Sequence, residues 1–172
     1  MTIRFAGNTG ERHVVIKSGR ETKGDLGIPG QIDGCPVTEI GDFSFFCCAG
    51  LTSVSIPASV TYIGHLAFRS CTGLASVAIP DSVKCIEHRA FNGCTGFTSV
   101  TIGKGVTRIA GEVFCGCRKL SDVAIHGDVS DLGLYTRKES IMTDWNVEEA
   151  KDSIKNGGRF GAKRATAFSA AA

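Results

Sequence analysis

Hydrophobic residues recur along the middle of the chain with a period of 23 residues. Three consecutive segments, 51–73, 74–96 and 97–119, align without a gap. Their sequences are LTSVSIPASVTYIGHLAFRSCTG, LASVAIPDSVKCIEHRAFNGCTG and FTSVTIGKGVTRIAGEVFCGCRK. The columns that stay apolar include those that begin at Leu51, Val54, Ile56, Val60, Ile63 and Phe68. A column of this kind is most simply explained by side chains that face one shared core, so each segment is predicted to form one coil of a repeat.

The spacing of the apolar positions within one segment predicts the course of each coil. Val54 and Ile56 have the alternate spacing of a strand, and Val60 and Ile63 indicate a second short extended piece after the turn at Pro57. The segment 65–68 is predicted to make one helical or 3-10 turn.

Stacking such coils about 4.8 Å apart forms parallel sheets over a continuous core. The predicted fold class is therefore an α/β solenoid, mainly of short parallel β-strands with short helical or 3-10 turns. In this fold Phe68 and Phe91 are expected to be buried neighbours in one ladder.

The ends of such a stack need covers, because they expose apolar faces and strand edges. The segments Met1-Thr-Ile-Arg-Phe5 and Val14-Val15-Ile16 flank the turn-forming Gly7-Asn-Thr-Gly10 and predict a hairpin. A capping box in Asn146-Val-Glu-Glu149 predicts a helix start; this helix either caps the last coil or is simply solvated. The predicted organisation is an N-terminal cap hairpin (1–25), a solenoid (26–133), a C-terminal capping helix region (134–158) and a flexible basic tail (159–172).

Composition favours a soluble globular chain. Hydrophobic residues make up 42% of the 172 residues, charged residues 21%, and the formal net charge is +2. This small charge argues against a nucleic-acid partner. The sequence shows no apolar run near the roughly 20 residues that span a bilayer and no apolar region typical of a signal peptide, so membrane insertion and classical export are not expected.

The cysteines suggest disulfides or zinc at first sight, but their spacing argues against both. Cys48, Cys71, Cys94 and Cys117 fall in one column, where side chains stack in register instead of crossing as a disulfide requires. They also span three coils, about 14 Å, which is too far for one zinc ion. We interpret them as small buried hydrophobic residues. The other cysteines form no C-x-x-C motif and are expected to be free thiols; they are Cys35, Cys47, Cys85 and Cys115.

His65 and His88 also share a column, with Asp42 one coil earlier. Two imidazoles one coil apart could hold a metal weakly, but exposed turn residues that coincide because the repeat was duplicated are the favoured interpretation. No P-loop, G-x-S-x-G, H-E-x-x-H or paired-carboxylate motif is present. The sequence therefore predicts no enzyme activity, no cofactor and no metal site.

The repeated unit x-x-L-x-x-V-x-I-P-x-x-V-x-x-I-G-x-x-A-F-x-x-C, seen in 51–71 and 74–94, resembles the BspA-like or treponemal-type class of leucine-rich repeats. The segment 28–41 is similar to the slightly longer first repeat of that class, and the resemblance covers about residues 26–133. Members of the class are typically surface or secreted proteins implicated in adhesion and protein binding. The resemblance thus implies a non-enzymatic protein-binding module, adhesin-like and at the cell surface or secreted, whereas the residues themselves leave the localisation unknown.

In a solenoid the outward positions are free to vary, so a ligand-binding face is expected there. The candidate residues are small hydroxyl-bearing side chains of the first strand with a few larger neighbours: Ser53, Ser55, Tyr62, Ser76, Lys84, Ser99, Thr101, Arg108 and Asp122. The expected partner is another protein of unknown identity. Two alternatives stay open: the hydroxyls merely cover a solvated sheet, or the chain is a structural repeat protein that self-associates end to end.

Overall fold

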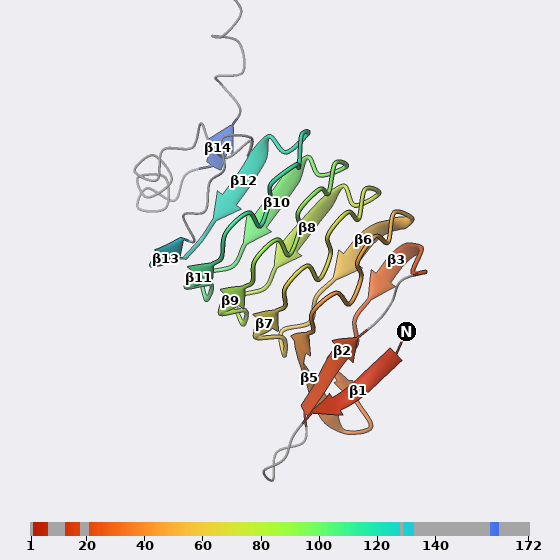
Figure 1. Ribbon diagram of the computed structural model, residues 1–172. Coiled ribbons are helices and arrows are strands. Elements are labelled where there is room, and N and C mark those ends of the chain that lie inside the picture. Colours follow the sequence, from red (N-terminus) through yellow and green to blue (C-terminus); the bar gives the residue numbers. More distant parts are fainter. Residues whose placement is uncertain (1, 7–12, 18–20, 128, 133–158, 162–172) are drawn as a thin grey trace, which may run out of the picture.

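The computed structural model describes residues 2–6, 13–17, 21–127, 129–132 and 159–161. These residues form a stack of coils, each with one longer strand and one very short strand (Figure 1). The strands are β1 (Thr2–Ala6), β2 (His13–Lys17), β3 (Gly24–Gly27), β4 (Gln31–Ile32), β5 (Cys35–Ile40), β6 (Leu51–Ser55), β7 (Tyr62–Ile63), β8 (Ser76–Ile79), β9 (Cys85–Ile86), β10 (Ser99–Ile102), β11 (Arg108–Ile109), β12 (Asp122–Ile125), β13 (Asp131–Leu132) and β14 (Arg159–Gly161).

Equivalent strands of successive coils pair in parallel and in the register that the repeat predicts. The longer strands form one sheet in the order β14-β12-β10-β8, and β6 pairs with β3 beside them. A second sheet follows the order β1-β2-β5-β7-β9-β11-β13, with β4 on β5, and its strands from β7 to β13 have two residues each. Ser76 pairs with Ser99 and Ser99 with Asp122, so each pairing step from β8 to β12 equals one repeat. The pairing of β3 with β6 departs from this step through a register shift. The fold is a parallel-strand β-solenoid of the leucine-rich-repeat type.

The helical or 3-10 turn expected over 65–68 is not formed: the described residues contain turns and no helix, so the α/β description is corrected. The reason lies in the backbone. Leu66 and Ser70 have positive φ values of 56° and 59°, which interrupt a right-handed helix. Their N–H groups donate to the next coil, Leu66 to His88 O at 3.2 Å and Ser70 to Asn92 O at 2.8 Å. Hydrogen bonds between coils therefore replace the bonds that a helix makes within itself.

The left-handed position at Ser70 supplies a stability prediction. Gly93 and Gly116 occupy the same place in the next two coils with φ values of 72° and 78°. Ser70→Gly is expected to raise the free energy of unfolding by about 0.5 kcal/mol, because relief of left-handed strain slightly exceeds the entropy cost of glycine. Urea unfolding measures the change. Ser76→Gly, in an extended strand, is the control and should be destabilising; a Ser70→Gly protein that loses stability to the same degree would contradict the prediction.

The core is one continuous cluster of the predicted apolar columns. The phenylalanine ladder runs along the stack, with ring centroids 5.0 Å apart for Phe45 and Phe68, 5.1 Å for Phe68 and Phe91, and 5.7 Å for Phe91 and Phe114. Phe68 and Phe91 are both 0% exposed. The prediction that they are buried neighbours is confirmed.

Strands of the two termini pair with the ends of the sheets. β1 and β2 are antiparallel, and β2 adds in parallel to β5. β14 lies antiparallel on β12, so residues 159–161 form a paired strand where the sequence analysis expected a flexible tail. The expected turn at 7–10, the expected helix that begins at Asn146 and the tail beyond 161 lie outside the described residues.

Candidate functional site

The outward face of the longer strands carries six of the nine candidate binding residues. We call this surface the hydroxyl face: Ser53, Ser55, Ser76, Ser99, Thr101 and Asp122. All are exposed except the half-buried Ser99 and Asp122. The strand pleat explains this placement, because residues between the buried Val and Ile columns must point outward.

Most hydroxyls of this face differ from other hydroxyls in the solenoid because they make no hydrogen bond. Thr61, Thr98 and Thr107 each donate to a carbonyl one coil earlier, at 3.3 Å in every case. Their hydroxyls therefore stabilise the stack. By contrast, the side chains of Ser55, Ser76, Ser99 and Thr101 make no hydrogen bond within the described part of the chain. These four hydroxyls are available to a ligand.

At the N-terminal side of this face an acidic residue joins the hydroxyls. Asp25 Oδ1 on β3 accepts hydrogen bonds from Ser53 Oγ at 2.6 Å and Thr52 Oγ1 at 2.9 Å. These two hydrogen bonds lower the pKa of Asp25, and the bond from Ser53 has the larger effect. Sequence reasoning missed Asp25, because β3 precedes the recognisable repeats and pairs with β6 through a register shift. Ser53 is thus held by the protein itself and differs from the free hydroxyls next to it.

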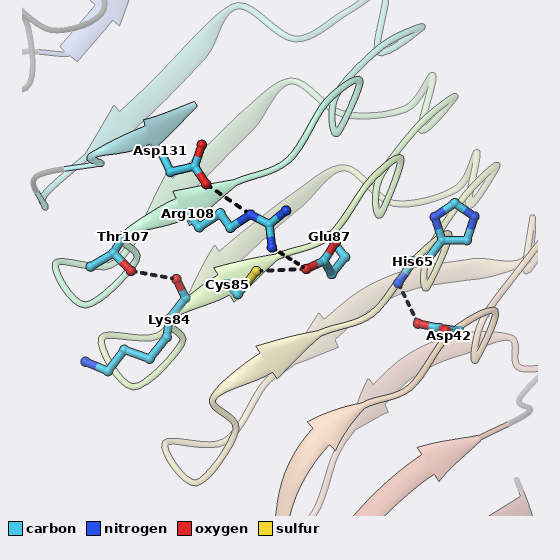
Figure 2. Close-up of polar contacts among 8 residues, drawn as sticks. All are labelled: Asp42, His65, Lys84, Cys85, Glu87, Thr107, Arg108 and Asp131. Atoms are coloured by element: carbon cyan, nitrogen blue, oxygen red, sulfur yellow. Dashed lines mark hydrogen bonds and ion pairs between the residues drawn. The ribbon is translucent and has the colours of Figure 1, made fainter. Parts of the chain in front are cut away.

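The other three candidate residues, Tyr62, Lys84 and Arg108, lie away from the hydroxyl face, on or beside the short strands β7, β9 and β11. Figure 2 shows Lys84 and Arg108 on this side of the coils. Tyr62 is half-buried, and burial together with the charge of Glu87 raises its pKa to about 12. The structure therefore divides the predicted set between two sheets.

Arg108 is held by two carboxylates (Figure 2). Its Nη1 lies 3.1 Å from Glu87 Oε1, and its Nε lies 3.1 Å from Asp131 Oδ2 on the next coil. Glu87 directly follows β9, Arg108 lies on β11 and Asp131 lies on β13. The two ion pairs therefore join three successive coils. Because its charge is already matched, Arg108 is a weak candidate for binding an anionic ligand.

Cys85 is the thiol nearest to this charged cluster. Its Sγ donates to Glu87 Oε1 at 3.2 Å. Burial, followed by this bond to Glu87, raises its pKa to about 11. A thiol that stays protonated at neutral pH is a poor nucleophile, which agrees with the absence of a catalytic pattern in the sequence.

The cysteine column forms a buried ladder with a role that sequence reasoning missed. Cys71, Cys94 and Cys117 are at most 1% exposed, as expected of small buried residues. Each thiol also donates to a backbone carbonyl 26 residues earlier: Cys71 to Phe45 O at 3.0 Å, Cys94 to Phe68 O at 3.1 Å and Cys117 to Phe91 O at 3.2 Å. All eight cysteines lie in the described part of the chain, and none of them forms a disulfide there. The thiols thus tie each coil to its neighbour and satisfy carbonyls that lie beside the phenylalanine ladder.

His65 and His88 stack with centroids 5.6 Å apart and an angle of 7° between the rings. Both are half-buried, not exposed as expected. The backbone N–H of His65 donates to Asp42 Oδ1 at 2.8 Å (Figure 2). Parallel rings direct their ring nitrogens side by side and not toward one point, which does not suit chelation. Within the described ranges no group of three or more metal-ligating side chains is found.

The model of the BspA type leucine rich repeat region matches residues 38–158 in six copies. This covers more than half of the chain. The chain belongs to this family. None of the curated proteins matches the chain.

Solved structures of leucine-rich-repeat proteins are similar to the chain. The T. pallidum leucine rich repeat protein TpLRR shares 32% identity with a TM-score of 0.70, over 76% of this chain and 61% of that one. A leucine-rich repeat protein from Bacteroides ovatus shares 34% identity with a TM-score of 0.50, over 52% of this chain and 23% of that one. A leucine-rich repeat protein from Bacteroides capillosus shares 23% identity with a TM-score of 0.57, over 72% of this chain and 99% of that one. This similarity supports the fold alone. The chain therefore spans less than two thirds of the length of the first two. In the described part of the chain, no helix is long and apolar enough to cross a membrane.

Proposed function

We propose that the chain is a non-enzymatic module that binds another protein through the hydroxyl face. The observation that carries this proposal is the contrast between two groups of hydroxyls. Those bordering the sheet bind carbonyls of the preceding coil, whereas Ser55, Ser76, Ser99 and Thr101 have no hydrogen-bond partner among the described residues. A face of free donors and acceptors on a rigid sheet offers directional hydrogen bonds without loss of backbone entropy on binding.

The arrangement of the face supports a protein partner rather than a small molecule. Ser76 and Ser99 pair directly across β8 and β10, and Ala78 and Thr101 pair in the same way two residues on. Small side chains at these positions let a partner approach the sheet closely over several coils. A BspA-type repeat at the cell surface, acting in adhesion, is consistent with this geometry, and this localisation is part of the proposal.

The proposal predicts that bulk on the hydroxyl face abolishes binding. The immobilised chain would be exposed to extracts of the cells that produce it, and captured proteins would be quantified by mass spectrometry. Ser76→Arg and Thr101→Arg are expected to reduce capture of a defined partner about tenfold or more, because a large charge at the centre of an interface prevents close packing.

The matched control is Thr95→Arg. Thr95 is an exposed turn residue, and the equivalent position of the next coil is Arg118, so arginine is tolerated there. All three variants should keep the melting temperature of the parent, since each changed side chain is exposed. Equal capture by the parent and both face variants, or no protein captured above bare resin, would refute the proposal.

End-to-end self-association was the alternative function. β14 pairs with Asp122, Val123 and Ala124 of β12 in antiparallel orientation. It thereby occupies the edge to which the first longer strand of a second copy would add in parallel. This pairing favours the binding module over the self-assembling protein, and light scattering over a range of concentrations tests it: the mass should stay constant.

A further inference from the structure

A cluster of aromatic and cationic side chains covers the turns that follow the short strands. We call it the turn patch: Phe43, Phe46, His65, Arg69 and His88. Phe43 packs edge-on against Phe46 at 6.0 Å and against His65 at 5.4 Å. The turn patch therefore crosses three successive coils, and none of its residues belongs to the hydroxyl face.

Phe43 is unusual in this patch because it faces solvent. It is 43% exposed and is the single large hydrophobic side chain that is exposed in the described part of the chain. Its backbone is left-handed, with φ at 57°, and the equivalent residue of the next coil, Leu66, is buried. A left-handed backbone does not favour phenylalanine, and an exposed ring adds no core packing. Phe43 contacts other side chains of the patch and not the core, so core packing gives no reason for phenylalanine at this position.

Arg69 carries a charge that forms no ion pair with the described residues. Its guanidinium lies over the Phe46 ring, 5.5 Å from the centroid, and its Nε is buried without a hydrogen-bond partner. The other half-buried arginine of the described residues, Arg89, is paired with Glu112 at 2.8 Å. A buried donor without an acceptor is rare in folded proteins. Arg69 as a whole is half-buried, so a partner can approach the rest of its side chain.

Carboxylates of the described residues do not fill this role. Asp42 is adjacent to Phe43 in sequence, but its Oδ1 accepts the backbone N–H of His65, and no ion pair joins it to Arg69 in the described part of the chain. The patch therefore combines an exposed aromatic ring with an unpaired guanidinium that is stacked and fixed in orientation. This combination matches a ligand that carries a carboxylate beside an apolar side chain.

We propose that the turn patch is a second interaction surface, which binds a segment of a partner protein that has an aspartate or glutamate next to an apolar residue. The carboxylate accepts hydrogen bonds from the Arg69 guanidinium, and the apolar side chain packs on Phe43 and the edge of His65. This surface goes beyond the hydroxyl face and does not depend on it.

A random-peptide phage library selected on the intact chain tests this surface. Enriched peptides are expected to contain an acidic residue adjacent to an aliphatic or aromatic one. Their labelled synthetic forms should bind the parent by fluorescence anisotropy and bind Arg69→Met about tenfold or more weakly, because methionine keeps the contact with Phe46 but removes the charged donor. Replacing the acidic residues of the peptide by amides should have the same effect.

Two further variants separate binding from folding. Phe43→Asn suits the left-handed backbone, so it should fold as well as the parent and still lose peptide affinity. Arg118→Met removes an equal charge from an exposed turn residue outside the patch and should bind peptide as the parent does.

The proposal would be overturned if no peptide family with an acidic residue beside an apolar one is enriched, or if the enriched peptides bind Arg69→Met as tightly as the parent. A concentration-dependent dimer of this chain that Arg69→Met abolishes would overturn it as well. Peptides whose binding is lost with Ser76→Arg but kept with Arg69→Met would also overturn it while supporting the hydroxyl face, so the two proposals fail separately.

Discussion

Replacing Phe91 by alanine is expected to lower the free energy of unfolding by about 3–5 kcal/mol. The Phe91 ring is fully buried, stacks on Phe68 and Phe114, and contacts Phe97 with centroids 5.8 Å apart. Its removal opens a cavity in the middle of the ladder that neighbouring coils cannot close, because hydrogen bonds to adjacent coils fix their spacing. Urea denaturation monitored by circular dichroism measures the loss.

Phe97→Leu is the matched control for this prediction. Phe97 is also fully buried, but its column holds Leu51, Leu74 and Leu120 in the other coils. The coil therefore accommodates leucine at this position, and the expected cost is below about 1.5 kcal/mol. A Phe91→Ala protein as stable as Phe97→Leu would show that the ladder contributes no more than any other column.

Raising the pH above 9 is expected to destabilise the protein strongly in reducing buffer. Burial, followed by the charge of Cys48, raises the pKa of the Cys71 thiol from the ordinary 9.0 to about 12. Between these two values the unfolded chain loses the thiol proton and the folded chain keeps it, so the folded state binds more protons and stability falls as the pH rises. At about pH 10.5 this one group should cost about 2 kcal/mol relative to neutral pH, at about 1.4 kcal/mol per pH unit.

Comparing variants isolates this thiol from the other groups that titrate in alkali, Tyr62 and Cys85 among them. Cys71→Ala should show a smaller loss of stability between neutral pH and about pH 10.5 than the parent does. Cys115→Ala, which removes a half-buried thiol that is not among the groups acting on Cys71, should lose as much stability as the parent. Urea midpoints at each pH provide the readout. Identical slopes in all three proteins would mean that Cys71 does not hold its proton in the folded state.

The candidate site was only partly predictable. The alternation of Val54 and Ile56 places Ser53 and Ser55 outward, and the repeat extends this inference to Ser76 and Thr101. Sequence could not reveal that Thr61 and Thr107 bind carbonyls while Thr101 does not, since this depends on the direction of backbone groups one coil away. Likewise, Tyr62 and Arg108 were grouped with these serines, although the corner after Pro57 and its equivalents directs them to another sheet.

The turn patch lay beyond sequence reasoning for a related reason. Phe43 and Leu66 occupy equivalent positions, yet one is exposed and the other buried. Arg69 becomes notable through its place over Phe46, which belongs to the preceding coil. Side chains outside the core columns are not constrained by the period, so their neighbours are known only from the three-dimensional packing.

The sequence by itself determined the length of the coil, the register of stacking, the buried columns and the family, because a period without gaps allows one consistent superposition of apolar positions. Tertiary structure decided the conformation of the turns at Leu66 and Ser70, where bonds to the next coil outcompete a helix, and the antiparallel docking of β14 on β12. The physical reason is that hydrophobic periodicity records which side of the chain is buried, whereas the partner of each backbone N–H depends on what the neighbouring coil presents.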